Sequence, residues 1–176
     1  MKILLSAAAL TMFAGFASRA IAQQTPDVAA QRAAMKKLEF LVGKWSGPAT
    51  VSRGPGEPIK ITQTEAVRFA GGELVLLVEG NGTNADGKLV FSALATISYD
   101  DSTSTYRFRA HSDGRFLDVP LTVAANGFSW GYDAGPLKVV NTMILTADGA
   151  WSETTESTYG STPPRKSVEM RLRHLQ

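Results

Sequence analysis

The spacing of apolar positions changes once along this chain. In Asp27–Leu41 apolar side chains recur at intervals of three and four, as at Met35 and Leu38, which is the period of one face of a helix. Pro26 stands just before this segment and Gly43 just after it, as is typical of the first turn and the end of a helix. The pattern predicts one short helix near the N-terminus.

Beyond this helix, runs rich in Val, Ile, Thr, Phe and Tyr alternate with Gly, Asn, Asp and Pro, a rhythm typical of barrels and sandwiches. Turn sequences such as Asp113-Gly114 and Asn126-Gly127 favour hairpins between successive runs. A meander of about ten strands avoids exposed edges by closing on itself, so we predict an all-β fold, an antiparallel up-and-down β-barrel of about ten strands with one short N-terminal helix. The predicted strands are Trp45–Ser52, Ile59–Phe69, Glu73–Glu79, Leu89–Tyr99, Tyr106–Ser112, Arg115–Val123, Phe128–Tyr132, Leu137–Thr146, Ala150–Tyr159 and Ser167–Leu175.

Alternation within the strands predicts an apolar interior. Phe108 and Ala110 share one face of their strand, whereas Arg109 lies on the other. The interior of a ten-strand barrel is wide enough to leave a cavity, and apolar ligands bind in such cavities. A packed core or a flattened, collapsed barrel is the alternative. The candidate ligand-lining residues are Phe91, Phe108, Met143 and Met170.

The first residues have the features of a secretory signal. Lys2 precedes the apolar run 3–17, and Ala20-Ile21-Ala22 provides a small-residue cleavage site. The run is too short for a membrane span, which disfavours an uncleaved anchor. We therefore expect residues 1–22 to be a cleaved signal peptide, 23–42 a helical segment and 43–176 the barrel, in a periplasmic or secreted protein.

The charge balance limits the partners. Lys2 and Arg19 account for the formal net charge of +2, so residues 23–176 carry equal numbers of basic and acidic side chains. Without a net charge or a basic run, neither nucleic acid nor an anionic membrane surface is an expected partner, and we expect no stable membrane insertion after signal cleavage. The chain has no Cys, which excludes disulfides and thiolate chemistry. No cofactor is expected.

Two strings resemble hydrolase motifs. Gly127-Phe128-Ser129-Trp130-Gly131 matches the Gly-x-Ser-x-Gly pattern of a nucleophile elbow, which needs a sharp turn at the Ser and a helix after it. The residues that follow favour a strand instead. His111-Ser112-Asp113 holds triad-type residues side by side, but neighbours on a strand point to opposite faces. We interpret both strings as structural and keep a serine hydrolase as a minor alternative.

Ligand chemistry is sparse elsewhere. Two histidines are too few for a structural zinc site, but a single axial His can hold haem, and His174 is the candidate for that role. Glu153 and Glu156 are three residues apart and so face opposite sides of a strand, while Asp100-Asp101 lies in a turn. We interpret all four acids as solvated surface charges.

The stretch Leu38–Gly47, with Gly43-Lys44-Trp45 at its centre, resembles the calycin superfamily of lipocalins, fatty-acid-binding proteins and nitrobindin-like barrels. It is most similar to an uncharacterised family of exported bacterial calycin-like domains. The resemblance implies that Trp45 closes one end of the barrel and that Arg171 or Arg173 packs on it as a cation–π pair. The haem-ligating His of nitrobindin-like proteins, near the start of the last strand, has no counterpart at Ser167-Val168.

The leading functional hypothesis is therefore an exported β-barrel that binds a small apolar or amphipathic molecule in its lumen. An accessory module that binds a protein or a glycan through the barrel surface is the main alternative. A serine hydrolase or a haem-binding barrel is less favoured. The sequence leaves enzymatic activity and oligomeric state open.

Overall fold

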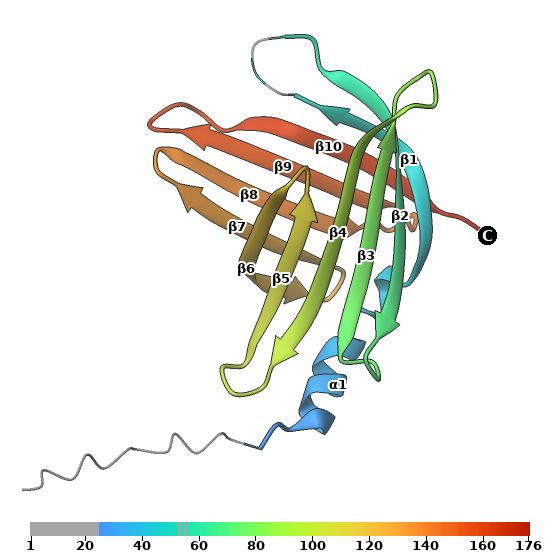
Figure 1. Ribbon diagram of the computed structural model, residues 1–176, viewed down its shortest axis with the longest axis vertical. Coiled ribbons are helices and arrows are strands. Elements are labelled where there is room, and N and C mark those ends of the chain that lie inside the picture. Colours follow the sequence, from blue (N-terminus) through green and yellow to red (C-terminus); the bar gives the residue numbers. More distant parts are fainter. Residues whose placement is uncertain (1–24, 53, 55) are drawn as a thin grey trace, which may run out of the picture.

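The computed structural model describes residues 25–176 except 53 and 55, so the predicted signal peptide lies outside the described residues. Ten antiparallel strands form a closed barrel in which sequence neighbours pair and the last strand pairs with the first (Figure 1), which confirms the predicted fold. Within the described residues, no helix is long and apolar enough to cross a membrane. The strands are β1 Gly43–Val51, β2 Ile59–Ala70, β3 Val75–Thr83, β4 Leu89–Asp100, β5 Thr105–Ser112, β6 Arg115–Ala124, β7 Gly127–Ala134, β8 Leu137–Leu145, β9 Trp151–Tyr159 and β10 Arg165–His174.

The predicted helix forms as two pieces, the α-helix α1 Val28–Lys36 and the 3-10 helix η1 Glu39–Leu41. The Asp27 side chain accepts a hydrogen bond from the Ala30 N–H and so caps the first turn of α1. The helix lies across one end of the barrel (Figure 1), which we call the closed end. The Tyr106 hydroxyl anchors it there by donating to the Ala34 carbonyl oxygen at 2.7 Å.

All ten predicted strands are present, and the largest shift in bounds is at β3. This strand begins two residues later than predicted, because Glu73 has a φ of +71° and belongs to the preceding turn. It also continues through Gly80 and Gly82, which the sequence pattern treated as the start of a loop. Glycine suits both strand positions, because side chains of β2 occupy the space where a Cβ atom would be.

Trp45 lies at the centre of the closed end. Its Nε1 donates to the Leu41 carbonyl oxygen at 2.8 Å, which fixes η1 against β1. Its ring meets Trp151 edge-to-face, with centroids 5.7 Å apart, and His174 in the same manner at 4.8 Å. Leu38 and Leu41 pack into the same cluster with no exposed surface, so Trp45 joins the helical segment to the barrel core.

The arginines of β10 differ from the expectation. Met170 and Leu172 face the core, so alternation turns Arg171 and Arg173 outward. Both guanidinium groups bind Asp148 at 2.6 Å on the outer surface. Hydrogen bonds from Thr146 and from the two arginines hold the pKa of Asp148 well below its usual range. It is His174, and neither arginine, that lies against the Trp45 ring.

Gly43, the glycine of the Gly-x-Trp step, leaves space for the His174 side chain. Gly43 has a φ of +134°, and a Cβ there would collide with the His174 imidazole. We expect Gly43→Ala to lower the free energy of unfolding by about 1–3 kcal/mol, as measured by urea denaturation. Gly87→Ala is the control, because Gly87 also has a positive φ but nothing near its Cβ position. Equal losses in the two variants would contradict the proposed role of the His174 contact.

Candidate functional site

The barrel interior is filled at one end and accessible at the other. Inward-facing Leu76, Ile97 and Met143, close to the closed end, are 0–1% exposed. Ala93 and Ser157 face the same interior nearer the opposite end and keep partly exposed surface. Solvent therefore reaches the part of the interior far from the closed end, which we call the lumen. Side chains fill the part near the closed end.

Three aromatic rings form a wall on the inner face of β5 and β7. Phe108 stacks on Trp130 with ring centroids 5.2 Å apart and planes 10° apart. Trp130 lies nearly parallel to Tyr132, at 6.4 Å and 6°. All three residues are half-buried, so this aromatic wall offers flat apolar surface that side-chain packing has not fully covered.

Polar side chains form a second inward-facing group, which we call the polar belt. It consists of Gln63 and Glu65 on β2, Asn141 on β8, and Glu153 and Thr155 on β9. The aromatic wall adjoins the belt directly, because Trp130 pairs with Asn141 across β7 and β8. An apolar surface next to convergent polar groups is the usual composition of a small-molecule site.

Glu65 is 7% exposed, and its carboxylate lies over Gly80 of the neighbouring strand. Gln63 Nε2 donates to its Oε1 at 2.8 Å. Burial raises the pKa of Glu65 from 4.5 to about 8 because it disfavours the charged form, and repulsion from Glu153 adds to this, while the Gln63 hydrogen bond opposes it. Glu65 is therefore mostly protonated at pH 7.

Glu153 corrects the surface interpretation drawn from sequence. Its Oε2 accepts a hydrogen bond from Trp151 Nε1 at 2.7 Å, and its Oε1 accepts one from Asn141 Nδ2 at 2.8 Å. Burial of the carboxyl group raises its pKa, although part of the residue stays accessible, and these two hydrogen bonds oppose the rise. The barrel thus holds two carboxyl groups in its interior that interact electrostatically.

Asn141 is the polar residue whose hydrogen bonding is incomplete. It is 1% exposed, and its Nδ2 donates to Glu153 and, at 3.0 Å, to Thr155 Oγ1. Its Oδ1 is buried and has no hydrogen-bond partner among the described residues. A buried acceptor without a donor is costly, which makes this atom the natural contact for a ligand donor.

The sequence-predicted lining residues all face inward but differ in depth. Met143 is fully buried and Met170 is 8% exposed, so both belong to the packed core. Phe108 is part of the aromatic wall, and Phe91 lies beside Gly82 with half-buried surface. Sequence reasoning missed Glu65, Asn141, Trp130 and Tyr132. Their signal was their position on inward-facing registers beside residues that were identified as core.

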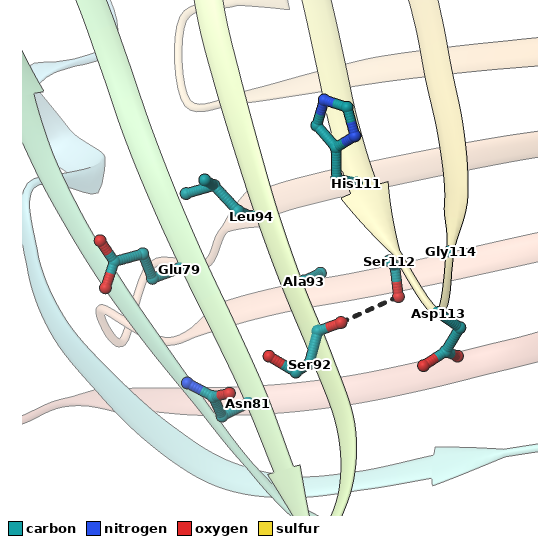
Figure 2. Close-up of a pocket in the computed structure, with 9 residues that line it drawn as sticks. All are labelled: Glu79, Asn81, Ser92, Ala93, Leu94, His111, Ser112, Asp113 and Gly114. Carbon is teal, nitrogen blue, oxygen red and sulfur yellow. Dashed lines mark hydrogen bonds between the residues drawn. The ribbon is translucent and has the colours of Figure 1, made fainter.

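The outer face of β3, β4 and β5 carries a shallow hollow (Figure 2) that holds the triad-like string. The His111 ring points away from Ser112 and packs against Phe116 at 4.9 Å. The Ser112 hydroxyl donates to the Ser92 carbonyl oxygen at 3.0 Å. Ser112 is therefore not in a geometry in which His111 could activate it.

The remaining candidates lie in structural positions. Ser129 lies in the middle of β7 and points outward between inward-facing Phe128 and Trp130, without the turn and helix of a nucleophile elbow. His174 packs on Trp45 at the closed end, away from the lumen. Within the described part of the chain, no three His, Cys, Asp or Glu side chains come together as a metal site would require.

Comparisons with known proteins find a structure of similar fold but identify no family. No profile of a known protein family matches this chain, and a search of curated proteins finds no match. The crystal structure of Rv2717c from M. tuberculosis is similar, with a TM-score of 0.60 and 13% sequence identity over 81% of this chain and 98% of that chain. At such low identity this similarity bears on the fold alone, and it leaves the predicted exported family without confirmation.

Proposed function

We propose that this protein is an exported barrel that binds a small amphipathic molecule in its lumen. The apolar body of the ligand lies along the aromatic wall of Phe108, Trp130 and Tyr132. Its polar end reaches the polar belt near Asn141. The observation that carries this proposal is the buried, unpartnered Oδ1 of Asn141, a residue that pairs with the half-buried Trp130 of the aromatic wall.

The interior also argues against a purely structural role for this region. A barrel that needed only a stable core would gain from apolar residues at Glu65, Asn141 and Glu153, since buried polar groups stabilise a fold only when they are fully paired. Here the interior holds two carboxyl groups that interact electrostatically and a buried carbonyl oxygen without a partner among the described residues. Groups of this kind concentrate at functional sites.

The lumen is tested by titrating the protein with N-phenyl-1-naphthylamine, an apolar probe that fluoresces when water is excluded. We expect Trp130→Ala to weaken binding about tenfold or more, because it removes the central ring of the wall. Phe116→Ala is the control, since this aromatic side chain is 60% exposed on the outer face. Native mass spectrometry of the purified protein tests for a ligand that co-purifies. An unmodified protein that binds no probe and carries no extra mass would contradict the proposal.

Export is part of the proposal and is supported by the signal-like N-terminal sequence. We expect the mature protein to begin at Gln23 and to appear in the extracytoplasmic fraction when it is expressed with residues 1–22 in a bacterial host. N-terminal sequencing of the purified protein checks this. A protein that retains Met1 and stays in the cytoplasm would argue against export and leave the lumen proposal intact.

A further inference from the structure

We infer, on the basis of the proposed lumen binding, that the ligand is an organic cation, an amine with a flat apolar body. Its N–H groups donate to Asn141 Oδ1 and to the Glu65 carboxyl group. The inference rests on the unpartnered acceptor of the polar belt, on the absence of a buried Lys or Arg beside the belt in the described residues, and on the aromatic wall next to it.

The amide and indole N–H groups of the polar belt and of the adjacent Trp151 donate to neighbouring side chains. Gln63 Nε2 donates to Glu65, and Trp151 Nε1 donates to Glu153. The Asn141 amide nitrogen donates to Glu153 and Thr155, which also fixes the orientation of the amide. The group still in need of a partner, Asn141 Oδ1, is an acceptor. A ligand that pairs with this oxygen must therefore present a hydrogen-bond donor to it.

The charges of the interior point to a cation. Buried or half-buried inward-facing ionisable groups in the described residues are Glu65, Glu153 and the phenols of Tyr99, Tyr106 and Tyr132. Arg115, Tyr159 and Arg165 stand on the same inward register but are exposed, at the end of the barrel opposite the helix. Described Lys and Arg residues lie on outward-facing strand positions, in loops, in the helical segment or at strand ends. Two carboxyl groups thus share the buried part of the interior, and no Lys or Arg of the described residues is buried there with them.

Unpaired buried charge is costly, so burial raises the pKa of both carboxyl groups and favours their protonated forms when no cation is bound. An ammonium group placed between them supplies the missing charge, favours their ionised form and displaces a proton. Around Glu65 the neighbours are Trp45, Gln63 and Gly80, and Glu153 acts on it electrostatically, so no protein cation competes for this position. The aromatic wall adds favourable contact for a cationic, flat ligand.

The test compares three indoles of similar size: tryptamine, the neutral alcohol tryptophol and the anion indole-3-acetate. At pH 7 we expect calorimetric titration to give at least tenfold tighter binding of tryptamine than of tryptophol, and the weakest binding for indole-3-acetate. Titrations in two buffers of different ionisation enthalpy report proton release, which we expect for tryptamine and not for tryptophol.

Two variants and a matched control locate the effect. Glu65→Gln, which keeps the size of the side chain, is expected to remove most of the preference for tryptamine and to reduce the proton release. Asn141→Leu is expected to weaken tryptamine and tryptophol together, because both donate to the same atom. Glu79→Gln changes an outward-facing glutamate of β3 whose side chain is 52% exposed, and it should leave all three affinities unchanged.

The outcomes separate this inference from the proposed function. Equal affinity for tryptamine and tryptophol, with both weakened by Trp130→Ala, overturns the cation and leaves lumen binding in place. Binding of N-phenyl-1-naphthylamine without any preference for the amine among the indoles has the same meaning. A protein that binds neither the naphthylamine nor any of the indoles overturns both.

Discussion

Trp45→Ala is expected to lower the free energy of unfolding by about 3–5 kcal/mol, the range for a large aromatic side chain removed from a packed core. Trp45 is 4% exposed and contacts Trp151 and His174 through its ring. The substitution also removes the donor of the hydrogen bond to Leu41, which links the helical segment to β1. In a domain of this size the change corresponds to a fall in Tm of about 10 °C, measured by thermal and urea unfolding.

Trp130→Ala is the matched comparison, since it removes the same side chain from a half-buried lumenal position. We expect Trp45→Ala to lose stability and keep its affinity for N-phenyl-1-naphthylamine. Trp130→Ala should lose that affinity with a smaller loss of stability. If Trp45→Ala unfolded at the midpoint of the unmodified protein, the account of the closed end would be wrong.

The fold was predictable because its signals are local. Period-two alternation and hairpin turn residues identify the ten strands, and the Gly-x-Trp step identifies the closed end. The arginines of β10 show where a resemblance misled. Alternation alone places Arg171 and Arg173 outward once Met170 and Leu172 are taken as core residues, and the structure follows that rule.

The candidate site was only half predictable. Phe108 was identified as an inward-facing aromatic, but the polar belt was not found, because Glu and Asn in a strand usually face water. Glu65 lies opposite Gly80 in the hairpin of β2 and β3, and Glu153 and Asn141 meet in the hairpin of β8 and β9. Turn residues predict that these strands pair, but hydrophobic alternation does not give the register that brings the polar side chains together.

The stability of the protein is expected to fall as the pH rises from about 4.5 to about 8, because of Glu65. Below 4.5 this carboxyl group is protonated in both the folded and the unfolded chain. Between the two values the unfolded chain loses the proton and the folded chain keeps it. Ionisation therefore stabilises the unfolded state and not the folded state. At about 1.4 kcal/mol for each pH unit, the loss reaches about 3–5 kcal/mol above pH 8.

Glu65→Gln cannot titrate, so urea denaturation at pH 5, 7 and 9 isolates the effect. We expect the variant to become progressively more stable than the unmodified protein as the pH rises, with Glu153→Gln acting in the same direction because the pKa of Glu153 is also raised. Glu79→Gln, on the exposed outer face of β3, should follow the unmodified protein at every pH. A constant difference between Glu65→Gln and the unmodified protein across this range would mean that the carboxyl group is hydrated in solution. A bound cation favours the ionised form of Glu65, so saturating tryptamine should flatten the same pH dependence in the unmodified protein. In Glu65→Gln, where only Glu153 of the two carboxyl groups remains, the flattening should be smaller.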